Sequence, residues 1–329
     1  MNLLNDFGFA PDGARARALD HRMRQSLGAS LAHIAEQVQG QIPYDTNALR
    51  RLLAALEAGA RLPPSAFGLY VDLVGAICDD QLDVAASLFD ELLRLVPQSV
   101  TRQLLAIDAP VLRPQQQRYT RLMGGEAGEF SIVAPSPEQF AQFIPDFDKA
   151  FALLRDTAPA LAEEFDALVS EVVLVSSNLG ADRYQFDGGS CYMLWGALFL
   201  NIGLPRSRVG LVEVLAHESA HMLLYGFAAE EALVENDDDE RYPSPLRIDE
   251  RPMDGIYHAT YVSARMHWMM SHLLDSGCLD AASRAEAEAA RADDLRNFLA
   301  GDSVVQRYGR LTATGDALMQ AARAYINAA

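Results

Sequence analysis

The sequence predicts a mainly helical protein of the α+β type, with a small β-sheet that immediately precedes a metal-binding helix. Apolar residues recur at helical spacing through the first 110 residues and again beyond residue 137. Two short apolar runs, residues 171–175 and 195–201, interrupt that pattern and are typical of buried strands. The helical pattern then returns with His-Glu-x-x-His at positions 217–221, so we expect a zincin-like active-site helix.

The N-terminal part is expected to be entirely helical. Its apolar periodicity predicts helices over residues 19–38, 49–56, 67–77 and 82–95, separated by proline or by short acidic residues. The composition becomes polar and glycine-rich between residues 112 and 137. We therefore expect a helical N-terminal region over residues 1–125, suited to binding a peptide or its leader, and a metal-binding catalytic region over residues 126–329. A long surface loop within one continuous domain explains the change in composition equally well.

The second half is expected to alternate between helices and the small sheet. Helices are predicted over residues 137–156 and 159–169, from Pro205 to about residue 228, and from Pro252 to about residue 274. A loop or a hairpin connection is expected over residues 176–192, between the two strands, and an acidic loop at residues 235–240. We interpret that acidic loop as solvated, because it lacks the spaced ligands and the turn glycine of a calcium loop. The chain beyond Asp280 is alanine-rich and expected to be helical.

Composition excludes several classes of function. Of the 329 residues, 45 are acidic and 27 are basic, and the resulting net charge of −18 disfavours a nucleic-acid partner. The apolar runs are too short to span a membrane, and the first residues lack the features of a signal peptide. Three scattered cysteines fit reduced thiols. We expect a cytoplasmic protein with neither a nucleic-acid nor a membrane partner.

The His-Glu-x-x-His motif predicts a metal site. His217 and His221 are four residues apart, so both imidazoles lie on one helix face and can hold one ion. Glu218 projects beside them, near enough to contact a metal-bound water. The apolar residues around the motif indicate a buried helix rather than a surface helix with two accidental histidines.

A third ligand is expected from the helix that follows Pro252. Glu213 lies on the motif helix itself, where three ligands in a row do not surround an ion. His267 is about 180° around the next helix from His258, and His272 lies about 21 Å further along it. The position of His258 near the helix start favours it as the third ligand, with His267 an ordinary core histidine.

Two arginines are candidates for holding a carboxylate of a bound co-substrate. Arg265 follows His258 by seven positions, about 10 Å along the same stripe of the helix. A salt bridge between Arg265 and one of the many acidic residues is an equally good interpretation. Arg251, immediately before Pro252, is the second candidate.

Two chemistries fit a three-histidine site. With zinc, an open coordination position would bind water, Glu218 would act as general base, and a peptide would be hydrolysed. With ferrous iron, the open positions would bind an oxo-acid and dioxygen. The motif alone favours zinc. A helical binding protein with a structural or vestigial metal site is a third class, although only Cys191 offers a distant fourth ligand.

The motif, together with Arg251-Pro252-Met253-Asp254-Gly255-Ile256-Tyr257-His258-Ala259, resembles a family of HExxH proteins from gene clusters for ribosomally made, post-translationally modified peptides. The helical N-terminal half and residues 197–201 are also similar. The resemblance implies an Fe(II)- and 2-oxoglutarate-dependent β-hydroxylase of a precursor peptide, with iron on His217, His221 and His258. The resemblance does not identify the residues that bind 2-oxoglutarate, so the assignment of Arg265 and Arg251 depends on geometry alone. It also implies no hydrolytic role for Glu218. The site lacks the carboxylate ligand of the usual two-histidine triad.

Overall fold

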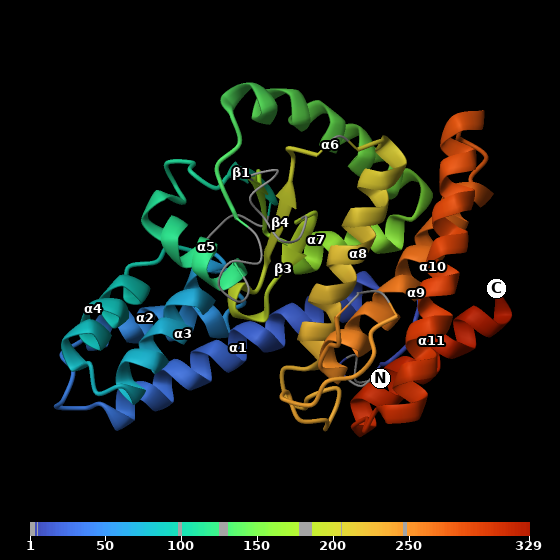
Figure 1. The fold of residues 1–329 in the computed structure, drawn as a ribbon. Helices are drawn as coiled ribbons and strands as arrows, with labels where there is room; N and C mark the ends of the chain where they lie inside the picture. Colours follow the sequence, from blue (N-terminus) through green and yellow to red (C-terminus); the bar gives the residue numbers. More distant parts are fainter. Residues whose placement is uncertain are drawn as a thin grey trace. The chain divides into compact units, whose positions relative to one another are not determined.

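A computed structural model describes residues 4, 6–97, 101–124, 131–177, 186–204, 206–245 and 249–329. These residues form a mainly helical structure with one small mixed sheet (Figure 1), which confirms the predicted class at this level. The helices are α1 (Gly13–Gln37), α2 (Thr46–Glu57), α3 (Ser65–Cys78), α4 (Leu82–Leu93), α5 (Gln116–Met123), α6 (Pro137–Thr157), α7 (Pro159–Leu168), α8 (Arg208–Phe227), α9 (Met253–Asp275), α10 (Ala281–Tyr308) and α11 (Ala313–Ala328). The strands are β1 (Gln103–Ala106), β2 (Glu171–Val175), β3 (Gly188–Ser190) and β4 (Ala197–Asn201).

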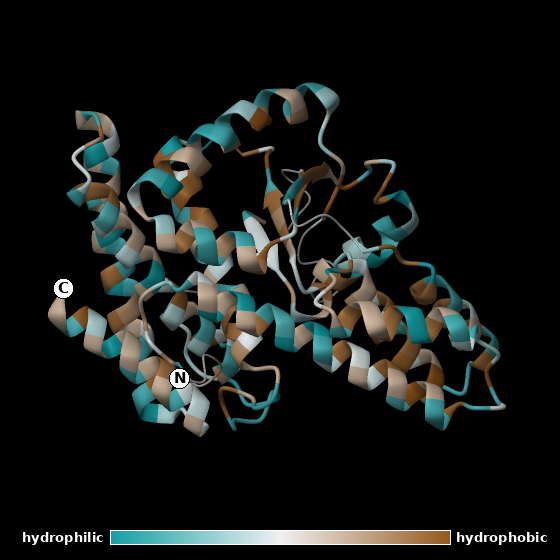
Figure 2. Cartoon of the chain, turned by 180° about the vertical axis from the view of Figure 1, so that it is seen from behind, coloured by the Kyte–Doolittle hydropathy of each residue, from teal (hydrophilic) through white to brown (hydrophobic). Residues whose placement is uncertain are grey.

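The sheet has the order β1-β2-β4-β3. β1, β2 and β4 are parallel, whereas β3 runs antiparallel to β4. Every residue of β2 and β4 is buried, which explains why both strands are continuous apolar runs rather than alternating ones. Figure 2 shows brown, hydrophobic strand segments at the centre of the sheet, whereas the helices carry both teal and brown residues.

The prediction of an entirely helical N-terminal part was wrong, because β1 lies within it, and β3 was not predicted as a separate strand. β1 consists of Gln-Leu-Leu-Ala, which lacks β-branched residues, and it becomes a strand because it pairs with β2. β3 consists of Gly-Gly-Ser, within the segment expected to be a loop or a hairpin connection, and it pairs antiparallel with the edge of β4. Both strands owe their conformation to a neighbouring strand rather than to local propensity.

The chain groups into two compact units, each assembled from separate stretches of sequence. The first contains Met1–Leu19, Pro145–Ala167 and Arg206–Ala329, and the second contains Asp20–Ile144 and Leu168–Pro205. The boundary expected near residue 125 falls in residues 125–130, outside the described residues. It stays a prediction.

The second unit contains the sheet and the N-terminal helices. α3 packs against α4 and α5, and α2 against α4. One core of this unit joins α5 to β2 and β4 through Tyr119, Val173 and Phe199. The Tyr119 hydroxyl donates to the buried Glu171 carboxylate at 2.9 Å, so the first charged group of β2 has a partner inside the core.

The first unit contains the helix with the His-Glu-x-x-His motif. α9 packs against both α8 and α10, and Figure 1 shows these helices in yellow, orange and red. α8 begins at Arg208, where the Ser207 side chain accepts a hydrogen bond from the Gly210 amide. Its expected start at Pro205 lies outside the described residues. α9 follows Pro252, in agreement with the sequence.

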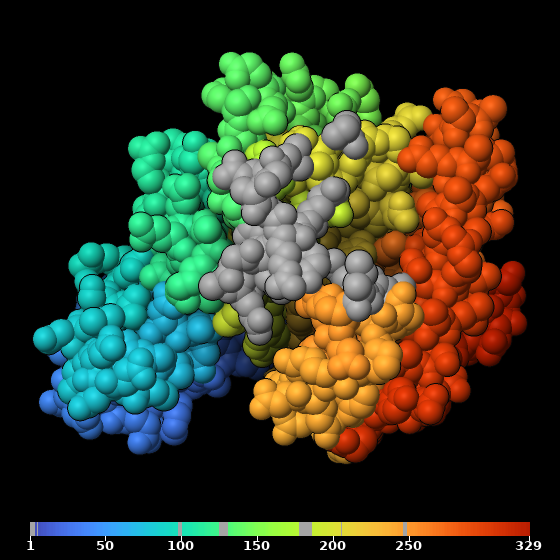
Figure 3. Space-filling model, in the orientation of Figure 1, coloured from blue at the N-terminus to red at the C-terminus, as the bar shows by residue number. Residues whose placement is uncertain are grey.

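The described residues between α8 and α9, 228–245 and 249–252, are held by defined pairings. Isolated bridges pair Val234 with Leu311 and Tyr242 with Arg251. Asn236 donates to the Tyr242 hydroxyl at 2.7 Å and accepts from the Arg310 amide at 2.7 Å. Part of the segment lies on the face of its unit seen in Figure 3, coloured yellow-orange to orange. The acidic tip, including Asp238, is exposed as expected, although its two ends are held in place.

The C-terminal region is helical, as predicted, but it consists of two helices. α11 begins after Thr312, whose side chain accepts from the Gly315 amide. The Tyr257 hydroxyl of α9 donates to the Gly315 carbonyl at 2.7 Å. Among the described residues, no helix has both the length and the apolar character needed to cross a membrane.

Candidate metal centre

The motif histidines lie on the accessible stripe of α8. Between Glu213 and Tyr225, the part-exposed positions are Glu213, Val214, His217, His221 and Tyr225, and the positions between them are buried. Four-residue spacing places His217, His221 and Tyr225 on one side of the helix, above one another. The buried remainder of the helix packs against α9 and α10. A rigid, well-packed helix therefore presents both imidazoles on its accessible face.

The structure brings all three predicted histidines together within the first unit. The Nε2 atoms of His217 and His221 are 3.2 Å apart, and the Nδ1 atoms of His221 and His258 are 3.1 Å apart. The His221 and His258 rings are nearly parallel, with centroids separated by 5.4 Å. His258 comes from α9, so the contact joins two consecutive helices through residues that are 37 positions apart.

The three rings form a row, with His221 in the middle. Two nitrogens that bind one ion at about 2.1 Å lie about 3.0–3.4 Å apart at octahedral or tetrahedral angles. The Nε2 pair of His217 and His221 has this spacing. His258 instead faces Nδ1, on the other side of the His221 ring. Consistent with this row, no group of three or more His, Cys, Asp or Glu side chains in the described ranges has the arrangement of a metal site.

Two carboxylates flank the row. Glu218 is buried, and its Oε1 lies 3.9 Å from His217 Nε2, on the side where the two Nε2 atoms meet. Asp254, one turn before His258 on α9, places Oδ1 at 3.8 Å from His258 Nε2. The row therefore has an acidic group near each end.

The surroundings of His221 and His258 favour their neutral forms. Burial lowers the pKa of His221 well below its ordinary value, and the adjacent His217 and His258 lower it further. Burial also lowers the pKa of His258, against the opposing effect of the Asp254 carboxylate. Neutral imidazoles have a free nitrogen lone pair, which is the form that binds a metal ion.

Two neighbours of the histidines were missed in the sequence. The Tyr225 ring lies 5.2 Å from the His258 ring and 6.4 Å from the His221 ring, between centroids. The Met266 sulfur lies 3.0 Å from His217 Nδ1. The spacing of Tyr225, four residues after His221, was the signal that could have identified it. Met266 had no such signal, because its approach depends on how α9 packs on α8.

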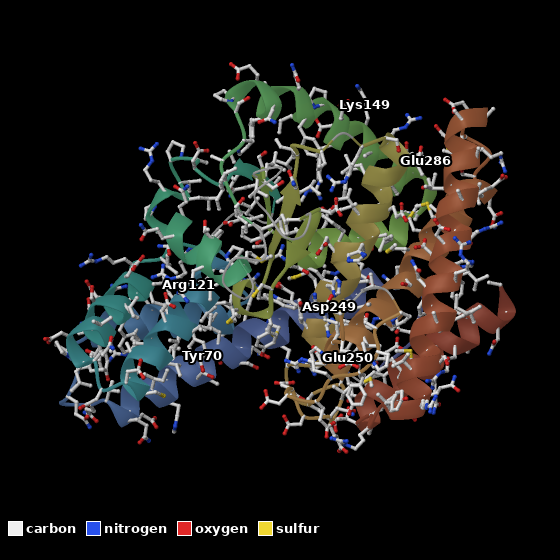
Figure 4. All side chains as sticks on the ribbon, viewed as in Figure 1. Tyr70, Arg121, Lys149, Asp249, Glu250 and Glu286 are labelled. Atoms are coloured by element: carbon white, nitrogen blue, oxygen red, sulfur yellow. The ribbon has the colours of Figure 1, made fainter. Side chains whose placement is uncertain are left out.

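The two candidate arginines are in different environments. The Arg265 side chain is buried and pairs with the buried Glu164 carboxylate, and it also donates to the Phe9 carbonyl at 2.7 Å. The structure thus shows the salt-bridge alternative for Arg265. Arg251 is part-exposed and pairs with Asp249 at 2.8 Å. Figure 4 labels Asp249 and Glu250 in the segment that leads into α9. Binding of a co-substrate by either arginine stays a prediction.

The remaining candidates of the first unit have other partners. His267 Nδ1 is 2.8 Å from the Tyr325 hydroxyl, in keeping with the core role expected for it. The ring of His272 stacks on Trp268. Glu213 faces Glu286, labelled in Figure 4 on α10, and its pKa is raised by burial and then by that neighbour. Cys191 belongs to the second unit.

Comparison with known proteins adds no family to this geometry. The sequence matches no protein-family model. A search of curated proteins also gives no match.

Proposed function

We propose that the protein is a non-haem Fe(II)- and 2-oxoglutarate-dependent dioxygenase that β-hydroxylates a residue of a ribosomally synthesised precursor peptide. The observation that carries the proposal is the pair of Nε2 atoms, 3.2 Å apart on the accessible stripe of α8. His258 and the resemblance of residues 217–221 and 251–259 to the peptide-hydroxylase family support it further. The donor set suits a divalent transition metal, because neutral imidazoles bind such ions and leave coordination positions open.

In this proposal, each of the three histidines has a defined role at the metal site. His217 and His221 hold the ion, and His258 supports His221 from α9. Bound iron supplies the one-electron oxygen chemistry of the reaction. In that reaction, one atom of dioxygen enters the peptide C–H bond, and the other enters 2-oxoglutarate as it becomes succinate and carbon dioxide. The Tyr225 ring lies beside His221 and His258 on the part-exposed face of α8.

A zinc metallopeptidase is the second candidate. The observation that favours it is Glu218, which is buried and lies 3.9 Å from the metal-facing nitrogen of His217. A carboxylate at this place can take a proton from a metal-bound water. The same residues would then hydrolyse a peptide bond without an oxidant.

Anaerobic titration with 2-oxoglutarate tests the proposal without the natural peptide. The Fe(II)-loaded protein should develop a weak visible charge-transfer band on addition of 2-oxoglutarate, and admission of air should release succinate. His221→Ala is the matched negative control. Peptide cleavage by the zinc-loaded protein that persists without oxygen, together with the absence of the band, would establish the metallopeptidase instead.

A further inference from the structure

The sulfur of Met266 contacts the outer nitrogen of the first motif histidine. Sδ of Met266 lies 3.0 Å from Nδ1 of His217, and the two residues come from α9 and α8. A thioether sulfur has lone pairs but no hydrogen, so it accepts hydrogen bonds and never donates them. The contact is attractive only when Nδ1 of His217 carries the proton. The neutral His217 ring then has its lone pair on Nε2, which faces His221.

We infer that Met266 is a positioning residue of the histidine site: its sulfur accepts the Nδ1 proton of His217 and thereby sets the tautomers of all three histidines. The inference rests on the proposed metal-binding function. It adds a residue outside the His-Glu-x-x-His motif, one that contacts a metal-binding histidine rather than the ion itself. The known outer partners of metal-binding histidines are mostly carboxylates, backbone carbonyls or water. A thioether accepts more weakly than these groups, so it orients His217 without making the ring strongly basic.

The proton positions follow along the row when no ion is bound. Each neutral ring carries one proton, and each close nitrogen pair needs one donor and one acceptor. With the His217 proton on Nδ1, His221 donates from Nε2 to Nε2 of His217 across 3.2 Å. His258 then donates from Nδ1 to Nδ1 of His221 across 3.1 Å.

If His217 and His221 held an ion through their Nε2 atoms, the second hydrogen bond would reverse. His221 would then carry its proton on Nδ1 and donate it to Nδ1 of His258. The His258 proton would lie on Nε2, which faces Asp254 at 3.8 Å. In this arrangement His258 is the outer acceptor of His221, and α9 supports both coordinating rings, through Met266 and through His258.

Nitrogen-15 NMR of histidine-labelled, metal-free protein reads the tautomer directly. His217 of the unaltered protein should be in the Nδ1–H form. Met266→Leu keeps the apolar volume and removes the acceptor, so His217 should shift toward a mixture of tautomers. Met266→Gln restores an acceptor through its amide oxygen and should return His217 to the Nδ1–H form. Met270→Leu, at a buried methionine of the same helix, is the matched control and should leave His217 unchanged.

Cobalt(II) affinity, followed by its visible absorption, is the second readout. Met266→Leu should bind cobalt roughly 10-fold more weakly, the lower end of the range for outer residues of metal sites. Met266→Gln should bind within about threefold of the unaltered protein. An unchanged His217 tautomer and unchanged cobalt affinity in Met266→Leu would overturn the inference. If the unaltered protein binds no cobalt, the proposed function fails, while the NMR measurement still decides the role of Met266.

Discussion

Arg265 and Glu164 form an ion pair in which the side chains are 1% and 0% exposed. The same carboxylate accepts a second arginine, since Arg15 Nη2 lies 3.4 Å from Glu164 Oε2. The two guanidinium groups also donate hydrogen bonds to backbone carbonyls: Arg15 to those of Gly8 and Ala10, and Arg265 to that of Phe9. These contacts connect residues 8–10, which precede α1, to Glu164 of α7 and Arg265 of α9 within the first unit.

Loss of the Glu164 charge should destabilise the protein strongly. Glu164→Gln leaves two buried guanidinium groups without a counter-charge, so we expect the free energy of unfolding to fall by about 3–5 kcal/mol. Urea denaturation measures the change. Glu163→Gln is the matched control, because Glu163 pairs with Arg17 on the surface and should contribute less than about 1 kcal/mol. A folded Arg265→Lys variant that needs much more 2-oxoglutarate would instead support the co-substrate role expected from the sequence.

The three histidines should contribute unequally to ion binding. His217→Ala and His221→Ala each remove a coordinating nitrogen, and the loaded ion should be lost on dialysis. His258→Ala removes only an outer partner, so affinity should fall by about 10–100-fold while the stoichiometry at high ion concentration is kept. Metal analysis and cobalt titration measure both quantities, with His272→Ala as the control. Complete loss of the ion in His258→Ala would favour the three-ligand set expected from the sequence.

Glu218→Gln separates the two chemistries. The substitution keeps the size and removes the base, and a positioned general base contributes about 10²–10⁴-fold to a hydrolytic rate. In a dioxygenase the iron and oxygen supply the oxidant, so succinate formation should remain measurable. The assay compares succinate release with peptide cleavage in the same preparation. A fall in 2-oxoglutarate turnover as large as that expected for hydrolysis would contradict the minor role assigned to Glu218.

Asp294 should make stability depend on pH. This side chain of α10 is 1% exposed, and its Oδ2 has no hydrogen-bond partner among the described residues. Burial, and then the nearby Glu213 carboxylate, raise the pKa of Asp294 to about 8. The folded state therefore retains a proton that the unfolded state has lost between about pH 4 and pH 8. Stability should fall as pH rises through that window, by at most about 1.4 kcal/mol per unit, and level off above it.

Denaturation of Asp294→Asn across pH 5–9 tests this expectation. Asparagine cannot ionise, so the variant should lose that slope and be more stable than the unaltered protein near pH 8. The exposed Asp293→Asn is the control and should keep the slope. Parallel profiles for the unaltered protein and Asp294→Asn would show that Asp294 does not titrate in this way.

The sequence revealed the parts of the fold that depend on local pattern. α2, with its periodic leucines, and α9, which starts after Pro252, were predicted to within a few residues. β1 was missed because its conformation depends on β2, and the position of β3 within its predicted loop or hairpin connection depends on β4. Hydrophobic periodicity also could not show that the chain forms two discontinuous units.

In the candidate site, too, the features set by local spacing were predictable and those set by tertiary packing were not. His217 and His221 share a helix face by spacing alone, and the approach of His258 was inferred from its place near the start of the next helix. The nitrogen that His258 presents to His221 depends on ring rotation, which a sequence does not encode. The ion pair of Arg265 depends on Glu164, which is 101 residues away in the chain.

The bridges between α8 and α9 also determine where the chain tolerates a change in length. Val234 is held by its pairing with Leu311 and Tyr242 by its pairing with Arg251, so added residues at the exposed Asp238 lengthen only the stretch between Val234 and Tyr242. Doubling such a stretch costs only about 0.6 kcal/mol of loop-closure entropy. An insertion between Arg251 and Met253 lies beyond both bridges and would rotate His258 away from His221. We therefore expect this segment to tolerate inserted residues at Asp238 but not at its junction with α9.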